Sequence, residues 1–202
     1  MYPRHRLDAL ADGIYGVAMT LLVLDIRFSD GAVIRTDGDL IAQLVNLIPK
    51  FGPYALSFWV LSGRWRAMVF GRTSHEPVSG AYVSWSLWHL FLVTMMPLST
   101  LVIGRYGSLA PSIWLYTANL VGLWLTTWLA SRRAPAAERE QVDDNFIGTI
   151  VMLVASAVVL ALSFLDTAWA TLGFLLTALT PLVERRFGRR KPGVVARRLG
   201  DI

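Results

Sequence analysis

Ionisable side chains in the first apolar stretch of the sequence are confined to its two ends. Residues 6–26 read RLDALADGIYGVAMTLLVLDI, with Asp12 near the start of the apolar run and Asp25 at its close. On a helix of 3.6 residues per turn, positions spaced at i, i+4, i+7 and i+11 form one stripe, here Gly13, Val17, Thr20 and Leu24. Hydroxyl oxygens on such a stripe can bind a partly dehydrated cation, so the pattern is typical of a membrane helix that faces something other than lipid.

The composition places this helix in a membrane protein. Hydrophobic residues make up 54% of the 202 residues and charged residues only 16%, which is too little polar surface for a soluble globule. Apolar stretches of about 20 residues can cross a ~30 Å hydrocarbon layer. They can be drawn at about 9–28, 51–70, 80–104, 109–131, 145–165 and 167–187. Because lipid tolerates no unpaired backbone groups, such runs predict helices, and the sequence predicts an all-α, six-transmembrane-helix bundle over 1–202 with a basic tail at 188–202.

Positive charges predict the orientation of these helices. Most of the 19 Lys and Arg residues fall on the side of the two termini, and the exceptions are Arg27, Arg35, Lys50 and Arg105. The positive-inside rule therefore predicts a multi-pass protein of the cell membrane with both termini cytoplasmic. The net charge of +5 gathers at membrane edges and in the tail, which favours contact with membrane lipids and argues against a nucleic-acid partner.

Residue types that carry metal or nucleophilic chemistry do not cluster in the sequence. The three histidines lie in different segments, cysteine is absent, and no phosphate-loop or Gly-x-Ser-x-Gly pattern occurs. An intramembrane enzyme would have to use Asp166 or the pair Asp143 and Asp144, which helix caps and loop charges explain more simply. We therefore expect no enzyme activity, no metal site and no cofactor.

The connection between the first two predicted spans carries a helix signal. Asp39 follows a Gly- and Asp-containing loop and is the expected N-cap, and an apolar face follows it at Leu40, Leu44, Leu47 and Ile48. Pro49 and Pro53 are expected to kink this helix rather than end it. The second span should therefore extend beyond the bilayer, beside the outer end of the first helix.

Asp12 needs a partner from another helix, because an unpaired charge at the bilayer edge costs several kcal/mol. Arg6 is six residues away, about 9 Å along the helix, which is too far for an easy direct pair. The candidates in other segments are Arg64, Trp65, Arg66 and His89. We expect a structural network of Arg6, Asp12, Trp65, Arg66 and His89 that locks the first helix to its own subunit and acts only secondarily in gating.

The same residues carry a family resemblance. The sequence resembles the transmembrane-protein-175 potassium channels, whose first helix opens with Arg-x-x-x-Phe-Ser-Asp. Here Arg6 and Asp12 keep the family spacing, while Leu10 and Ala11 replace Phe and Ser. A looser similarity continues through the next two apolar segments, at Trp65-Arg66, Leu90-Phe91-Leu92 and Met96-Pro97.

The resemblance implies a homotetrameric, potassium-selective channel that conducts passively through a pore lined by the first helix of each subunit. It implies a hydrophobic constriction at Val17 and a filter completed by Thr20 and Leu24. Val17 is smaller than the Leu or Ile usual in the family. A ring of four Asp25 carboxylates would concentrate cations at the outer mouth, unless Asp25 pairs with Arg27 or is simply solvated.

Three alternatives remain open on the residues alone. Val17 and Leu24 could be ordinary packing residues, with the Thr20 hydroxyl bonded to the Gly16 carbonyl of its own helix. The alternative function is a proton-coupled secondary transporter that works through Asp12 and His89. The protein could also be a membrane scaffold that conducts no ions.

Overall fold

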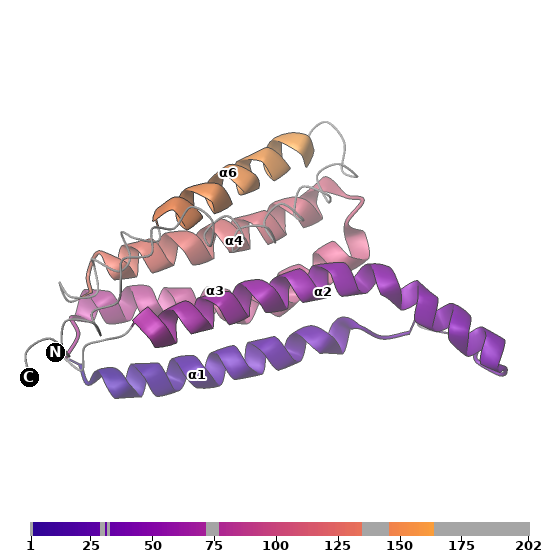
Figure 1. The fold of residues 1–202 in the computed structure, drawn as a ribbon, viewed down its shortest axis with the longest axis horizontal. Coiled ribbons are helices and arrows are strands. Elements are labelled where there is room, and N and C mark those ends of the chain that lie inside the picture. The colour runs from indigo at the N-terminus through magenta and orange to yellow at the C-terminus, as the bar shows by residue number, and fades with distance from the viewer. Residues whose placement is uncertain (1, 29–30, 32, 72–76, 135–145, 164–202) are drawn as a thin grey trace, which may run out of the picture.

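The structure, a computed structural model, describes residues 2–28, 31, 33–71, 77–134 and 146–163 (Figure 1). Within them the elements are α1 (Arg4–Leu21), the 3-10 turn η1 (Leu22–Asp25), α2 (Asp37–Gly71), α3 (Gly80–Tyr106), α4 (Ala110–Ser131) and α6 (Phe146–Ser163). The described part of the chain is all-helical, as predicted. The predicted helix at 167–187 and the tail at 188–202 lie outside the described residues, so the count of six stays a prediction.

Two of the described helical stretches are long and apolar enough to cross a membrane. They are Arg4–Leu24 and Gly80–Tyr106, which correspond to the first and third predicted spans. The first span begins and ends earlier in the sequence than the predicted 9–28, because the α-helix starts at Arg4 and ends at Leu21, and η1 continues it only to Asp25. A closing 3-10 turn of this kind satisfies carbonyl groups that the last turn of an α-helix leaves without partners.

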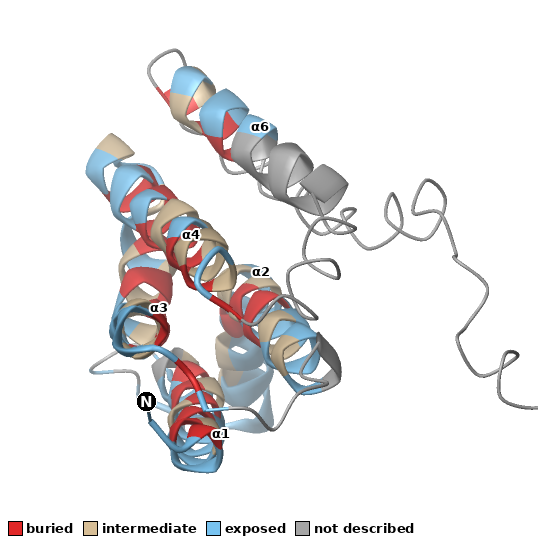
Figure 2. Cartoon of the chain, turned by 90° about the vertical axis from the view of Figure 1, so that its left-hand side faces the viewer, coloured by how far each residue is buried: buried red, intermediate tan, exposed pale blue. Residues whose placement is uncertain are grey.

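The helices run alongside one another, with α3 at the centre of the bundle. It packs against α1, α2 and α4, and α6 packs on the far side of α4. Figure 2 shows α1 at one edge of the bundle, well apart from α4 and α6. The core of the bundle contains fully buried apolar side chains from α2, α3 and α4, among them Leu61, Val93, Met96, Ile113 and Leu123. This arrangement leaves one whole face of α1 uncovered.

Helix α2 has 35 residues and continues through both prolines, as predicted. Its start differs from the prediction, because the helix begins at Asp37 and the N-cap is Thr36 rather than Asp39. The Thr36 hydroxyl accepts a bond from the Asp39 amide at 3.2 Å, and Asp39 Oδ2 accepts from the Thr36 amide at 2.9 Å. This reciprocal capping box satisfies two amide groups at the helix start, which a lone Asp39 cap would not do.

Hydroxyl groups join α2, α3 and α4 inside the bundle. The Ser57 hydroxyl lies 2.7 Å from the Thr100 hydroxyl and 2.9 Å from the Tyr116 hydroxyl, and all three side chains are buried. Asn119 of α4 bonds to Ser99 of α3 in the same layer. These polar contacts fix how α2 lies on the other two helices, and α2 in turn helps to hold α1.

Candidate functional site

The stripe predicted to line a pore lies on the uncovered face of α1. Val17 is 59% exposed and Leu24 66% exposed, and the two other members of the stripe, Gly13 and Thr20, are exposed as well. The opposite face of α1 packs into the bundle through Leu7, Ala11, Tyr15 and Ala18 (Figure 2). The subunit therefore leaves the candidate stripe available to lipid or to another subunit.

Two glycines add to this uncovered face. A Cβ atom built at Gly13 or at Gly16 would meet nothing within 4 Å, so the subunit itself gives neither position a reason to lack a side chain. Gly in a helix costs roughly 0.5–1 kcal/mol relative to Ala. In membranes, small residues let two helices approach closely. The open positions at Gly13 and Gly16 would let another helix approach this face of α1 closely.

The Thr20 hydroxyl is bonded within its own helix. It donates to the Val17 carbonyl at 2.8 Å and to the Gly16 carbonyl at 3.1 Å, so the bond to Gly16 weighed in the sequence analysis is present. This contact uses the hydroxyl hydrogen and leaves the lone pairs of the oxygen free to accept. Because the side chain is exposed, that oxygen can still serve as a ligand.

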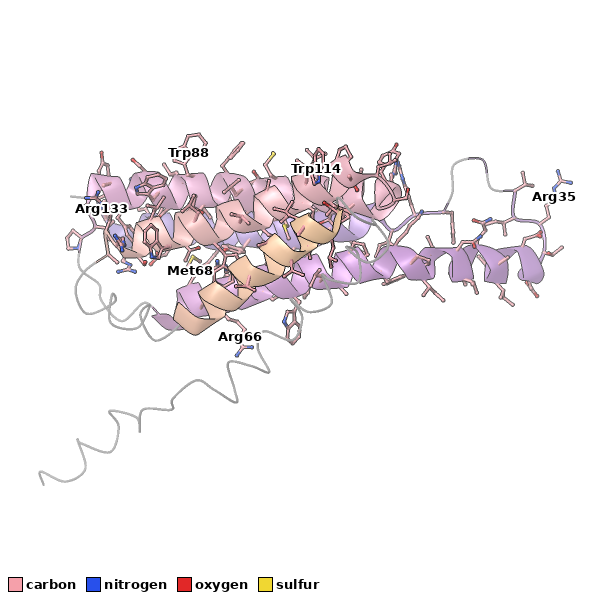
Figure 3. The ribbon with its side chains drawn as sticks, turned by 90° about the horizontal axis from the view of Figure 1, so that it is seen from above. Arg35, Arg66, Met68, Trp88, Trp114 and Arg133 are labelled. Atoms are coloured by element: carbon pink, nitrogen blue, oxygen red, sulfur yellow. The ribbon has the colours of Figure 1, made fainter. Side chains whose placement is uncertain are left out.

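Asp12 receives its hydrogen bond from α2. Among the four candidates, the indole Nε1 of Trp65 donates to Asp12 Oδ1 at 2.9 Å. Arg6 and Arg66 are exposed, and Figure 3 shows Arg66 directed away from the bundle. Within the described part of the chain, no hydrogen bond or ion pair joins either arginine to Asp12.

His89 belongs to a second cluster, which joins three helices. Its Nε2 lies 2.8 Å from the Tyr15 hydroxyl of α1, and its Nδ1 lies 3.2 Å from the Thr126 hydroxyl and 3.3 Å from the Thr127 hydroxyl of α4. Sequence reasoning placed His89 beside Asp12 and missed these three partners. Two features of the sequence could have indicated these partners. Tyr15 lies one turn after Asp12, and the adjacent hydroxyls of Thr126 and Thr127 lie within an apolar run.

The N-terminal end of α1 has an anchor that the sequence analysis counted only as positive charge. Arg4 is buried, its guanidinium carbon lies 5.7 Å from the centre of the Tyr82 ring, and its Nε lies 3.9 Å from Asp8 Oδ2. The preceding Tyr2 pairs with the backbone of Val78 through bonds of 3.1 and 3.2 Å. Together these contacts fasten the start of α1 to the start of α3.

The other end of α1 is tied to α2. The Lys50 ammonium donates to the Arg27 carbonyl at 2.9 Å, just beyond η1. Asp25 ends η1, but its side chain lies outside the described part of the structure, so its place at an outer mouth stays a prediction. The candidate helix is thus held at both ends and along one face while its other face is uncovered.

Comparison with known proteins agrees with this arrangement. The family model described as "Endosomal/lysosomal potassium channel TMEM175" matches residues 6–97. A protein named as a potassium channel from Chamaesiphon minutus is 31% identical, over 83% of this chain and 87% of that protein. The chain belongs to the TMEM175 family. A potassium channel of a Chryseobacterium species is 27% identical over 49% of this chain and 48% of its own length.

The fold is similar to that of a solved structure. The crystal structure of a lysosomal potassium-selective channel TMEM175 homolog from Chamaesiphon minutus aligns with a TM-score of 0.73 and 24% identity, and the match covers 90% of this chain and 96% of that one. The family prediction made from the sequence is confirmed by the 31% identical relative and the matching family model. The homologues of this TMEM175 chain are named potassium channels. Because such channels are not enzymes, this chain is no enzyme.

The matched region contains the candidate site of this TMEM175 chain. Residues 6–97 include α1 from Arg6 onward, all of α2 and most of α3, and so contain both the uncovered stripe and the Trp65 and His89 anchors. The Thr126 and Thr127 partners of His89 lie on α4, beyond the matched residues.

Proposed function

We propose that this chain is a potassium-selective channel that conducts passively through a tetrameric pore lined by α1. One observation carries the proposal, namely that the predicted stripe is uncovered in the subunit while the rest of α1 is packed and anchored. Potassium as the permeant ion is supported by the family model and by two relatives named potassium channels. No cofactor is required.

Four copies of α1 around one axis would turn the stripe into rings. The rings of Val17 and Leu24 side chains narrow the path and exclude bulk water, while the ring of Thr20 hydroxyl oxygens binds a partly dehydrated ion. Asp25 at the outer end concentrates cations before they enter. Ions then move down their electrochemical gradient, with no coupled substrate.

The basic residues set the orientation of this channel. With both termini in the cytoplasm of the cell, Arg4 and Arg6 lie on the inner side of the membrane, and Arg27, Arg35 and Lys50 on the outer side. The excess of Lys and Arg on the inner side contacts anionic lipid headgroups. Asp25 then faces the outside.

The proposal is tested by permeation in liposomes. Thr20→Val removes the hydroxyl but keeps the shape of the side chain, and Val17→Ala widens the apolar ring. We expect Thr20→Val to lower the ratio of potassium to sodium permeability, measured from reversal potentials, and Val17→Ala to raise the conductance.

Thr94 supplies a matched control, because it is an exposed threonine on α3 with the same kind of intrahelical bond, to the Phe91 carbonyl at 2.7 Å. Thr94→Val should leave permeation unchanged. Unchanged permeation in Thr20→Val and Val17→Ala would remove α1 from the pore. Saturating flux that is coupled to protons would instead identify a carrier.

A further inference from the structure

The first part of α2 projects past the rest of the bundle. The bond from Lys50 to the Arg27 carbonyl places residue 50 level with the end of η1. Residues 37–49, which precede it, therefore continue about 20 Å farther at 1.5 Å per residue. Figures 1 and 3 show this projection, with Arg35 at its far end. Because Arg4–Leu24 already fits the thickness of a hydrocarbon layer, this outer segment, residues 37–50, lies outside that layer.

The outer segment carries an apolar stripe that its own subunit does not cover. The exposed fractions are 61% for Ile41, 49% for Leu44, 55% for Val45 and 64% for Ile48. The spacing i, i+3, i+4 and i+7 puts these four side chains, here called the outer stripe, on one face of the helix. Polar side chains occupy the other face at Asp39, Gln43, Asn46 and Lys50.

An apolar helix face outside the hydrocarbon layer needs a protein partner. Contiguous exposed apolar surface on a soluble segment marks an interaction site. Leu47 is the buried apolar side chain among described residues 37–50, and it lies beside the outer stripe rather than on it. The spacing of the stripe matches the narrow seam through which two helices pack lengthwise.

The direction of the outer segment indicates which partner covers it. In Figure 1 the segment bends toward the side of the bundle on which α1 lies. Helix α1 carries the uncovered stripe and the open positions at Gly13 and Gly16. Uncovered side chains thus occur both on the membrane span α1 and on the outer segment that bends toward its side.

We infer that the outer stripe docks onto the outer segment of a second copy of this chain, so that the segments form a collar around the outer mouth. The inference rests on the proposed function, because it needs the copies to assemble around α1. It adds a contact outside the membrane that holds the copies together and shapes the approach of ions to the pore.

Site-directed cross-linking tests the collar, since the chain contains no cysteine. Single variants Val45→Cys and Ile48→Cys, reconstituted in liposomes and treated with a short bismaleimide, should yield cross-linked dimers. Asn46→Cys, on the opposite face of the same turn, should remain monomeric on the gel. Equal cross-linking at all three positions, or none at the first two, would overturn the collar.

A second measurement separates the collar from the channel itself. Ile41→Asn combined with Ile48→Asn should lower the tetramer fraction in detergent about tenfold, since each substitution places an amide without hydrogen-bond partners in an apolar interface. The matched change Ala42→Asn should not. A tetramer that conducts potassium but gives no cross-link refutes the collar alone, whereas a wild-type chain that forms no tetramer refutes the proposed function as well. The collar is also refuted if the thiol of Ile48→Cys fails to react with a water-soluble maleimide because lipid alone covers it.

Discussion

The indole of Trp65 donates a hydrogen bond to Asp12 Oδ1 at 2.9 Å and joins α2 to α1. The donor is neutral and directional, so the carboxylate is satisfied without an ion pair. Bonds to charged groups are the stronger class of protein hydrogen bonds. Trp65 therefore fixes the rotation of α1 about its axis, which decides which residues face outward.

Trp65→Phe should destabilise the subunit by about 1 kcal/mol, because it removes the donor to Asp12 but keeps an aromatic ring. The free energy of unfolding in mixed micelles measures the loss. Trp59→Phe is the matched control on the same helix, where the indole is exposed. Equal losses in both variants would show that the bond to Asp12 contributes nothing.

Tyr15→Phe should also cost about 1 kcal/mol, the order found for hydrogen bonds between membrane helices. The substitution removes the hydroxyl that lies 2.8 Å from His89 Nε2, at a side chain only 1% exposed. Thermal unfolding of the purified protein tests this. Tyr106→Phe at an exposed position should leave the melting temperature unchanged, and a similar fall there would contradict the role given to Tyr15.

Gly16→Leu should leave the subunit folded but prevent its assembly, since a Cβ atom at this position meets nothing within 4 Å in its own subunit. Circular dichroism should report unchanged helicity, while native mass spectrometry reports loss of the tetramer and flux assays report loss of potassium current. Ala118→Leu, a change at an exposed position of α4, is the control, because α4 lies well apart from α1 (Figure 2). A conducting Gly16→Leu tetramer would exclude close packing of α1.

Acid should fray the start of α2. The backbone amides of Arg35 and Thr36 donate hydrogen bonds to the Asp39 carboxylate, and the Thr36 hydroxyl lies beside it. These contacts lower the pKa of the Asp39 carboxyl from its ordinary 3.8. A lowered pKa means that the ionised form stabilises the folded helix start, fully above pH 3.8 and progressively less as the pH falls through the lowered pKa. Hydrogen exchange at residues 37–41, corrected for the intrinsic pH dependence, should rise in acid. Asp39→Asn should abolish this dependence, and its persistence there would assign the effect to another group.

The amino-acid sequence alone determined the features that repeat along one helix. Hydrophobic spacing identified α1 and its outward stripe, and the apolar run through Pro49 and Pro53 predicted the long α2. Both could be predicted because the residues that a helix buries in lipid or in a core recur along its own sequence with the helical period. The spacing of Arg6 and Asp12 was enough to indicate the family, which the comparisons then established.

Only the tertiary structure decided which side chains meet between helices. In the structure Asp12 accepts a hydrogen bond from Trp65 rather than from an arginine, His89 lies beside Tyr15 and Thr126, and Arg4 is buried against Tyr82. Such pairs depend on the crossing and relative shift of two helices, and a shift of one turn, about 5.4 Å, exchanges every partner while leaving each helix's own pattern intact. The bounds of α1 and α2 depend instead on local bonds, a 3-10 turn after Leu21 and a capping box between Thr36 and Asp39, which the sequence prediction placed elsewhere.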